Sequence, residues 1–396
     1  MKILIAHRYF WPDQVNCGQI LWHVAQHLQL KGHHVDIITS LPSRNYNSNK
    51  IQAKKIETVK QVNITRINLS SEAGRPLVRI FNAFKLGIMT NYLALQNKYD
   101  VIISSAVPPI LGGFFASIAA LMTKSRFYYF CMDLYPEVGK ISGDFSNPIL
   151  FNLLEKIDSW NCKNAKSIIV HSSDMKRTLE KRNTNKKLKI EIINNFSVPS
   201  ENKLNSSFKI KNLNKNKKLS IIFTGNVGRF QRLDKIIDAM SLIKYRSDIE
   251  LIIMGDGVAK KDLIERVKKT KANVTFFDYQ PINIAKDAIK KADIGLVTLM
   301  PNTYKYAYPG KVMTYLEQGR PFISTIEPES ELARTMKNEG FGFSVEGADT
   351  TKIANLFTKL ADDTSWKLRM CEAAKIAYEK NFTMNKILNQ WSNIIV

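Results

Sequence analysis

The sequence predicts an α/β protein made of two doubly wound domains. Its 396 residues exceed what one ordinary hydrophobic core holds. In both halves, short continuously apolar segments alternate with segments of helical period, as in parallel sheets covered on both faces. A polar, Ser- and Asn-rich stretch, 197–218, separates the halves. We expect a first domain over 1–200, a linker over 201–218, a second domain over 219–380, and a C-terminal helix over 381–396 that packs back towards the first domain.

The first half contains five expected strands and five expected helices. Its strands have continuous apolar runs rather than strict alternation, which is typical of parallel strands buried on both faces. The expected strands span 2–7, 34–40, 100–105, 126–132 and 167–172. The expected helices span 19–30, 77–95, 111–122, 148–160 and 174–181.

The second half repeats this order of elements. Its expected strands span 219–225, 249–255, 274–279, 293–299 and 321–326, with helices between them and a last helix over 384–394. The longest apolar run of the chain, 106–122, contains two prolines and two glycines. We interpret this run as a turn followed by a buried helix rather than as a membrane span.

The charge of the chain is strongly positive. There are 58 Lys and Arg against 35 Asp and Glu, giving a formal net charge of +23. Such an excess favours an anionic partner, namely nucleic acid, anionic lipid or phosphorylated small molecules, although a general bias towards Lys and Asn contributes. No aromatic RNA-reading motif and no recognition helix is visible, so we expect no nucleic-acid partner.

The cysteines and the N-terminal segment indicate the compartment. Four widely spaced cysteines form no CxxC pair, which argues against a zinc site and against a disulfide framework. No HxH or HExxH spacing occurs, and we expect no metal. The apolar stretch at the start of the sequence is too short for a signal peptide, and polar residues follow it directly. We therefore expect a cytoplasmic protein.

The segment "FTGNVGRFQRLD", 223–234, joins an apolar strand to a helix. Gly225 and Gly228 permit a tight turn and a close approach of the backbone to a ligand. A following helix offers unpaired N–H groups, and Arg229 adds a guanidinium suited to phosphate. The combination favours a phosphate or diphosphate site. The alternative is a structural turn beside a surface arginine.

A second segment, "YAYPGKVMTYLEQGRPFI" over 306–323, places a cation where a helix begins. Gly310 opens the helix, and Lys311 lies in its first turn, where the helix dipole disfavours positive charge. A bound anion would offset that cost. Thr314 and Glu317 share the face of Lys311 and could hydrogen-bond a ribose diol. The alternative is an ordinary solvated helix face.

Three positions of the first half also follow strands. Gly18 lies at the start of the first helix, which is the phosphate position of dinucleotide folds. No GxGxxG is present, so we expect no nicotinamide cofactor. Asp133, in "CMDLYPE", follows a strand end and could position or deprotonate an acceptor hydroxyl, or else cap a helix. His7 also ends a strand.

As a whole, the chain resembles the retaining GT-B glycosyltransferases of family 4, in the branch that builds bacterial surface polysaccharides. The resemblance covers nearly the whole chain. In the first half it rests on "YFWPD…CGQI…VAQHLQLKGHHVDIIT", "DLYPE", "SSDMKRTL" and "IINNFSV". In the second half it rests on "FTGNVGRFQRLD", "LIIMGDGVAKKDL", "ADIGLVTL" and "PGKVMTYLEQGRP". It implies a GT-B fold, with two Rossmann-like domains facing a central cleft.

The resemblance also implies how substrates are held. The second domain would bind a nucleotide sugar and the first its acceptor, without metal or cofactor. Asp133, Arg229 and Lys311 would be catalytic. The positions implied to line the diphosphate are Gly18, Gly225, Asn226, Gly228, Arg229 and Lys311, and those implied to flank the base are Phe277 and Tyr279. The family's paired glutamates correspond to Tyr306 and Thr314 here, which leaves Thr314 or Glu317 for the ribose.

The implied reaction transfers a hexosyl unit from a nucleoside diphosphate sugar, expected to be a UDP sugar, with the anomeric configuration retained. The implied acceptor is a growing surface polysaccharide on polyprenyl diphosphate. A basic amphipathic helix over 75–98 could lie on anionic lipid at the inner face of the cell membrane, or pack as an ordinary core helix. A sugar-nucleotide epimerase on the same scaffold, and a nucleic-acid-binding protein, are the alternatives.

Overall fold

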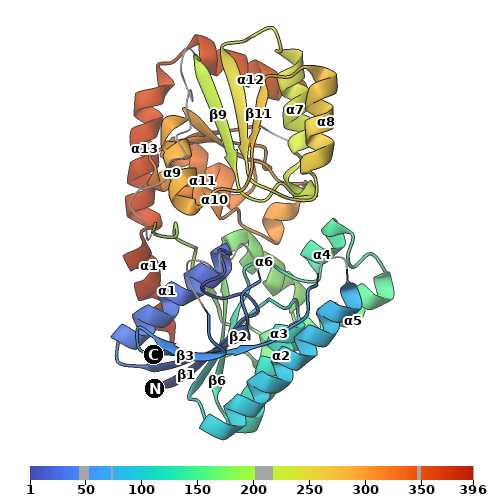
Figure 1. Ribbon diagram of the computed structural model, residues 1–396, viewed down its shortest axis with the longest axis vertical. Coiled ribbons are helices and arrows are strands. Elements are labelled where there is room, and N and C mark those ends of the chain that lie inside the picture. The colour runs from blue at the N-terminus through green and yellow to red at the C-terminus, as the bar shows by residue number, and fades with distance from the viewer. Residues whose placement is uncertain (44–52, 73–74, 201–216, 346–348, 396) are drawn as a thin grey trace. The chain divides into compact units, whose positions relative to one another are not determined.

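The computed structural model describes residues 1–43, 53–72, 75–200, 217–345 and 349–395. The chain divides into two compact units, each with its own parallel sheet (Figure 1). Unit 1 holds Met1–Asn194, Tyr306–Tyr308 and Asn385–Val396; unit 2 holds Asn195–Lys305 and Pro309–Met384. Most of the expected linker, 201–216, lies outside the described residues. The α/β class and the two doubly wound sheets are as the sequence predicts.

The sheet of unit 1 has eight strands in the order β3-β4-β2-β1-β5-β6-β7-β8. All neighbours are parallel except β3 and β4, which are antiparallel. The five expected strands are present, and β3, β4 and β8 are additional. The bounds are β1 Lys2–Ala6, β2 His34–Ser40, β3 Ile56–Val59, β4 Val62–Ile67, β5 Val101–Ser105, β6 Arg126–Phe130, β7 Ser167–Val170 and β8 Ile190–Ile192.

The helices of unit 1 cover this sheet. They are α1 Asn16–Leu30, α2 Pro76–Asn97, α3 Leu111–Thr123, α4 Glu137–Ser142, α5 Pro148–Asn164, α6 Ser173–Arg182 and the C-terminal α14 Met384–Ile395. The apolar run 106–122 forms the turn before α3 and most of α3 itself. No helix in the described ranges has the length and apolarity needed to cross a membrane.

Helix α14 completes the core of unit 1. The Trp391 ring is buried and meets the Phe130 ring edge-on, with centroids 5.0 Å apart. The Tyr128 hydroxyl donates a hydrogen bond to the Ile394 carbonyl at 2.9 Å. The last helix of the chain therefore packs on β6, in the middle of the first unit.

The sheet of unit 2 has six parallel strands in the order β11-β10-β9-β12-β13-β14. Their bounds are β9 Leu219–Thr224, β10 Ile249–Met254, β11 Val274–Phe277, β12 Ile294–Val297, β13 Phe322–Ser324 and β14 Gly342–Ser344. Two short 3₁₀ turns are present, η1 Arg229–Gln231 and η2 Thr303–Lys305. The α-helices are α7 Leu233–Leu242, α8 Lys260–Thr270, α9 Ile282–Lys291, α10 Lys311–Glu317, α11 Glu331–Glu339, α12 Thr350–Asp362 and α13 Trp366–Asn381.

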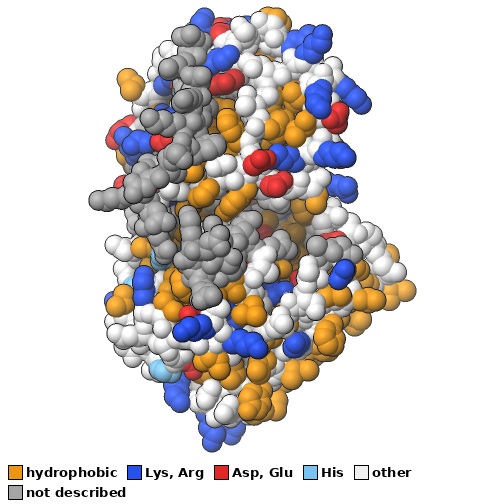
Figure 2. All heavy atoms as spheres, viewed as in Figure 1, with side chains coloured by type: hydrophobic (Ala, Val, Ile, Leu, Met, Phe, Trp, Pro, Cys, Tyr) orange, Lys and Arg blue, Asp and Glu red, His pale blue; other side chains and the backbone are white. Residues whose placement is uncertain are grey.

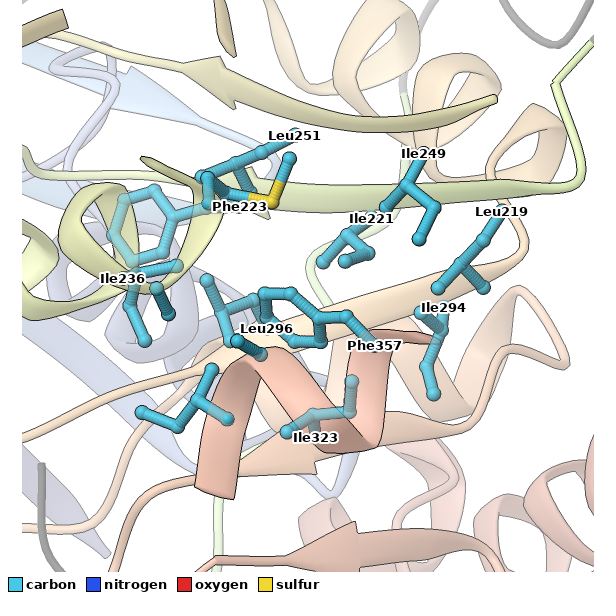
Figure 3. Close-up of a cluster of buried hydrophobic side chains, with 14 of the residues drawn as sticks. Leu219, Ile221, Phe223, Ile236, Ile249, Leu251, Ile294, Leu296, Ile323 and Phe357 are labelled. Atoms are coloured by element: carbon cyan, nitrogen blue, oxygen red, sulfur yellow. The ribbon is translucent and has the colours of Figure 1, made fainter. Parts of the chain in front are cut away.

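Strand β9 runs through the centre of this unit, and all six of its residues are buried. Leu219, Ile221 and Phe223 point from one face of it into a cluster that includes Ile236 of α7 and Phe357 of α12 (Figure 3). Full burial on both faces explains the uninterrupted apolar run 221–223 at its centre. This packing fixes the end of β9, from which the glycine-rich segment continues.

Candidate functional site

The candidate site lies at the carboxyl edge of the sheet in unit 2. Successive strands β9, β10 and β11 are laid down in one direction, and the chain then returns to place β12 on the other side of β9. Ligands of doubly wound folds bind beyond the carboxyl ends of strands at this kind of reversal. The loops after β9 and β12 are therefore where the topology expects a ligand.

The loop after β9 is held against the loop after β10 by backbone contacts. Gly225 has a φ of +117°, a conformation that suits glycine. A Cβ on Gly255 would lie 1.9 Å from the Gly225 carbonyl oxygen, and a Cβ on Gly257 would lie 2.4 Å from that of Val227. The Val227 amide donates to the Asp256 carbonyl at 2.8 Å. These two loops meet so closely that only glycine fits at 255 and 257.

Arg229 stands at the first position of η1, directly after the buried Gly228. Its side chain is exposed, and no hydrogen bond or ion pair links its guanidinium to another described residue. Helix α7 begins only at Leu233, after Arg232 adopts a left-handed conformation with φ 45°. The expected helix after the glycines is therefore a short 3₁₀ turn first, and it presents Arg229 beside the exposed Gly225 and Asn226.

Lys311 lies over the same loop. It is the first residue of α10, with Gly310 at the N-cap, as the sequence predicts. Its ammonium donates to Gln231 Oε1 at 3.0 Å and sits 3.6 Å from the centroid of the Phe223 ring. Its Cε is 3.9 Å from the position of a Cβ on Gly225. The structure thus brings Lys311 to the glycine loop, 86 positions earlier in the chain.

The charge of Lys311 is not neutralised by a nearby acid. No carboxylate of the described residues lies within ion-pair distance of the ammonium. Burial therefore holds the pKa of Lys311 well below its ordinary value of 10.5. A desolvated ammonium without a counter-charge is unfavourable, and an anion in front of it would remove that cost.

Strand β12 closes the other side of the site. The Met300 amide donates to the Phe230 carbonyl at 2.8 Å, and the Thr298 hydroxyl donates to the Gln231 carbonyl. These bonds join the loop after β12 to η1. The 3₁₀ turn that carries Arg229 is therefore fixed from the neighbouring strand as well as from β9.

Strand β11 brings the two predicted base-flanking residues to the same edge. Phe277 ends the strand, and its carbonyl accepts from the Gly255 amide at 3.0 Å. Tyr279, two residues later, is 40% exposed. Lys260, at the start of α8, donates to the Gly255 carbonyl at 3.0 Å and to Asp278 at 2.5 Å. The end of β11 thus borders the glycine loop after β10 through its backbone, next to the Lys260–Asp278 pair.

Thr314 and Glu317 have partners within the protein. The Ser197 hydroxyl lies 3.3 Å from Thr314 Oγ1 and 2.8 Å from Glu317 Oε2. The Lys286 ammonium is 2.7 Å from Glu317 and 2.7 Å from the Val198 carbonyl. Glu317 therefore fastens the segment around Ser197 to α9 and α10, and either side chain would have to exchange partners in order to hold a ribose.

Asp133 lies in unit 1, after β6. It forms an antiparallel bridge with Ala307 of the same unit, and the neighbouring Leu134 amide donates to the Tyr306 carbonyl at 2.8 Å. Helix α4 begins later and has Pro136 at its N-cap, so the alternative in which Asp133 caps a helix is wrong. Burial raises the pKa of Asp133 from 3.8 to about 6.

Gly18 and His7 lie close together in unit 1. A Cβ on Gly18 would be 2.5 Å from the Tyr9 carbonyl oxygen, so glycine lets α1 pack against the loop after β1. His7 is fully buried, with Nδ1 2.5 Å from Ser105 Oγ and Nε2 3.0 Å from Cys17 Sγ. Burial lowers the pKa of His7 to about 3 and raises that of Cys17 to about 12, so both groups are neutral near pH 7.

The structure thus gathers Gly225, Asn226, Gly228, Arg229 and Lys311, with Gly310, Phe277 and Tyr279, at one edge of unit 2, while Gly18 and Asp133 belong to unit 1. Sequence reasoning missed Gly255, Gly257 and the contact of Gln231 with Lys311. The two glycines could have been found from "MGDG", which follows a buried strand just as "TGNVG" does. Gln231 carries no comparable signal, because its contact with Lys311 depends on the fold.

Comparison with known proteins identifies the class of protein that this chain resembles. Residues 218–363 match the family described as Glycosyl transferases group 1. A protein of Pseudomonas aeruginosa named "Probable glycosyltransferase WbjE" is 25% identical over 313 residues, which cover 75% of this chain and 74% of that protein. The domain match and this relative support a glycosyltransferase.

Solved structures share the fold over the full length. HepE of Anabaena, in complex with UDP, has a TM-score of 0.70 at 12% identity, covering 100% of this chain and 99% of that one. WaaG, a glycosyltransferase involved in lipopolysaccharide biosynthesis, has a TM-score of 0.70 at 13% identity, with coverage of 100% and 99%. These similarities confirm the predicted GT-B fold.

Proposed function

We propose that this chain is a retaining, metal-independent hexosyltransferase. It takes the sugar from a nucleoside diphosphate sugar, a UDP sugar in our proposal, and passes it to a surface-polysaccharide acceptor carried on polyprenyl diphosphate. The group 1 domain and the WbjE relative support the transferase class. The donor, the acceptor and the stereochemistry are the proposed parts.

The observation that carries the proposal is the pair of cations at the glycine loop. Lys311 is desolvated and has no carboxylate partner among the described residues. The exposed Arg229 guanidinium makes no hydrogen bond or ion pair with any of them either. A diphosphate supplies the missing negative charge to both.

Departure of the diphosphate is the step that these cations would promote. The bond from the anomeric carbon to the phosphate oxygen breaks, and its electron pair leaves on that oxygen. Arg229 and Lys311 stabilise the growing negative charge, which is worth about 3 kcal/mol per donor in comparable sites. The acceptor oxygen bonds to the same face of the anomeric carbon, and its proton passes to the Asp133 carboxylate.

A uridine base is the proposed occupant of the region near Phe277 and Tyr279. The HepE structure of the same fold contains UDP, which supports this nucleotide for the present chain. An aromatic ring beside a nucleobase contributes by stacking and tolerates any base. We therefore expect preference for UDP to come from polar groups nearby, such as the Lys260–Asp278 pair.

The acceptor and the place of action follow from the proposed pathway. WaaG, which shares the fold, is involved in lipopolysaccharide biosynthesis, and this supports a glycan acceptor destined for the cell surface. A polyprenyl-linked acceptor resides in the membrane. The enzyme would then act at the inner face of the cell membrane, attached to its surface.

A nucleotide panel tests the proposal directly. Thermal unfolding is followed with UDP, GDP, ADP and the corresponding glucose conjugates, with and without EDTA. A ligand at 100 times its Kd stabilises the protein by about 2.7 kcal/mol. We expect stabilisation by UDP and UDP-sugar that EDTA does not change. Failure of every nucleotide to stabilise the protein, or stabilisation that EDTA abolishes, would contradict the proposal.

A further inference from the structure

Gln231 lies between the two cations of the candidate site. It is the last residue of η1, two positions after Arg229. Its side-chain oxygen accepts a hydrogen bond from the ammonium of Lys311, the first residue of α10, at 3.0 Å. No other acceptor among the described residues lies within hydrogen-bond distance of that ammonium. The Gln231 side chain therefore connects the turn that carries one cation to the helix that carries the other.

The backbone of Gln231 is fixed by its neighbours. Its amide donates to the Gly228 carbonyl at 3.1 Å, and its carbonyl accepts from the Thr298 hydroxyl in the loop after β12. The adjacent Phe230 carbonyl accepts from the Met300 amide at 2.8 Å. The side chain thus starts from a backbone that is held at both of its polar groups, so its contact with the ammonium has a defined position.

The amide of Gln231 orients the ammonium without neutralising it. An ammonium has three N–H donors, and Gln231 accepts one of them. The Phe223 ring, whose centroid is 3.6 Å from Lys311 Nζ, adds an attraction to its π face but no formal charge. A carboxylate in place of the amide would form an ion pair with Lys311. The neutral partner therefore leaves the positive charge available to an anion.

No acidic group compensates the charge of Lys311 from the described elements around it. Strands β9 and β12 contain no charged residue, and η1 contains only the exposed Arg229. The acids and the tyrosine of the other neighbouring elements have partners of their own: Asp234 pairs with Arg232, Asp256 accepts from the Gly257 amide, Glu317 pairs with Lys286, and the Tyr315 hydroxyl donates to backbone carbonyls.

This lack of a counter-charge is particular to the Lys311 site. Around α7 and α8, Figure 2 shows acidic and basic side chains interspersed, and Arg266 pairs there with Asp238 at 2.6 Å. Burial without such a partner lowers the pKa of Lys311. A hydrogen bond to the charged form acts in the opposite direction. Gln231 is therefore the polar contact that favours the ammonium over the neutral amine.

We propose that Gln231 is a positioning residue for the donor diphosphate, because it holds the Lys311 ammonium, in its charged form, at the glycine loop beside Arg229. The diphosphate part of this inference rests on the proposed function, whereas the effect of Gln231 on Lys311 does not. With the ammonium held in place beforehand, binding needs less ordering of this side chain. A glutamate at 231 would itself supply the counter-charge and would repel a diphosphate. The neutral amide thus selects a ligand that brings its own negative charge.

Two substitutions of Gln231 separate these effects. Gln231→Met keeps the length of the side chain and removes its oxygen, whereas Gln231→Glu keeps an acceptor and adds a negative charge. Gln96→Met and Gln96→Glu, at an exposed position of α2 in unit 1, are the matched controls. The first measurement needs no nucleotide. The Lys311 amine is labelled with acetic anhydride over a pH series, and mass spectrometry gives the pH midpoint at which it becomes reactive.

We expect Gln231→Glu to raise this midpoint by about 1–3 on the pH scale, because an opposite charge close to the ammonium favours its charged form. Gln231→Met should lower the midpoint, because the charged form loses its hydrogen-bond acceptor. Both Gln96 variants should reproduce the wild-type midpoint. A midpoint that neither Gln231 variant changes would overturn the proposal.

The second measurement is calorimetric binding of UDP-glucose, at one pH below and one pH above the midpoints of the wild type and Gln231→Met. Gln231→Glu should bind at least ten-fold more weakly at both. Gln231→Met should lose more affinity at the higher pH, since protonation restores its ammonium at the lower one. An equal loss at both pH values would show a structural role only, and the proposal would be wrong. A wild type that binds neither UDP nor UDP-glucose would contradict the proposed function, while the labelling midpoints would still decide the effect of Gln231 on Lys311.

Discussion

Arg229 is the residue whose substitution tests the chemistry with least effect on the fold. Its side chain is exposed and has no partner among the described residues. We expect Arg229→Ala to lower kcat by 10²–10³, about 3 kcal/mol, because a donor to the leaving diphosphate is lost. The melting temperature should stay within about a degree. Arg266→Ala, which removes the ion pair between Arg266 of α8 and Asp238 of α7, is the control and should leave kcat unchanged.

Substitution of Lys311 should weaken ligand binding without lowering the stability of the protein. Between its lowered pKa and 10.5, the unfolded chain holds a proton that the folded chain has released, so this residue makes stability rise with pH in that window. Lys311→Met removes the buried ammonium. We therefore expect an equal or higher melting temperature at pH 7 together with at least ten-fold weaker UDP binding by calorimetry.

The exposed Lys261→Met, at the start of α8, is the control for Lys311. It should change neither quantity. A Lys311→Met protein that melts several degrees lower than wild type would show that the ammonium stabilises the free protein and needs no anion in front of it.

The Asp133 carboxyl group should determine how kcat depends on pH on the acidic side. Its pKa of about 6 means that the carboxylate needed to accept a proton forms only as the pH rises through that value. We expect kcat to rise with pH around 6 in the wild type, and Asp133→Asn to lose that limb and at least 10² in rate. Asp144→Asn, on an exposed residue of the same unit, should retain the wild-type profile.

The stability of Asp133→Asn provides a second measurement. The folded chain binds more protons than the unfolded chain between pH 3.8 and about 6, so wild-type stability falls as the pH rises through this window. Asp133→Asn should therefore melt higher than wild type at pH 7.5. A lower melting temperature there would mean that the carboxylate, rather than the acid, is stabilised in the fold.

The glycine loops after β9 and β10 contact each other through their backbones, so a change in one should displace the other. Gly255→Ala places a methyl group 1.9 Å from the Gly225 carbonyl, so the loops after β9 and β10 must separate. We expect a loss of stability of about 1–3 kcal/mol from backbone strain, and loss of UDP binding. Gly340→Ala, with φ +72° and no atom within 4 Å, is the control. It should cost about 1 kcal/mol and leave binding intact. Equal UDP affinity in Gly255→Ala would show that the loops do not act together.

The elements that sequence reasoning missed have a common physical cause. Strand β4 contains Arg66, whose buried guanidinium pairs with Glu57 of β3, so both strands look too polar for a buried sheet. Strands β8 and β14 have three residues each and give no periodic signal. Apolar runs identified the central strands, because those are buried on both faces.

Helix α2, which leaves large apolar side chains such as Phe81 and Ile88 exposed, shows another limit of sequence patterns. Helical periodicity gives α2 one side with Phe81, Phe84 and Ile88 and another with Ala83, Leu86 and Gly87, but it does not say which side packs inside. The outcome depends on Phe115 of α3, which needs the space left by Gly87. For the candidate site, local motifs predicted Gly225, Arg229 and Lys311. Gln231, and the partners of Glu317, depend on contacts between distant segments.

The C-terminal helix α14 contributes to the stability of the whole molecule because its apolar side chains are part of the core. Ile387, Leu388, Trp391 and Ile395 of α14 are all buried in the fold. We expect Trp391→Ala to cost about 3–5 kcal/mol, a large share of the 5–15 kcal/mol of a typical domain. Chemical denaturation measures it, with Trp160→Ala, at a partly exposed position, as the milder comparison. A loss below about 1 kcal/mol would mean that α14 is dispensable to unit 1.

The discontinuous composition of unit 1 determines how the protein can be divided for experiments. The polypeptide passes from one unit to the other four times, at 194–195, 305–306, 308–309 and 384–385. A fragment that stops near residue 200 therefore lacks both Tyr306–Tyr308 and α14, and exposes the ring of Phe130 that Trp391 covers. A fragment made from the first half of the gene therefore lacks part of the core of unit 1. Residues 385–395, supplied by circular permutation or as a separate peptide, would restore the last helix to unit 1, which would still lack Tyr306–Tyr308.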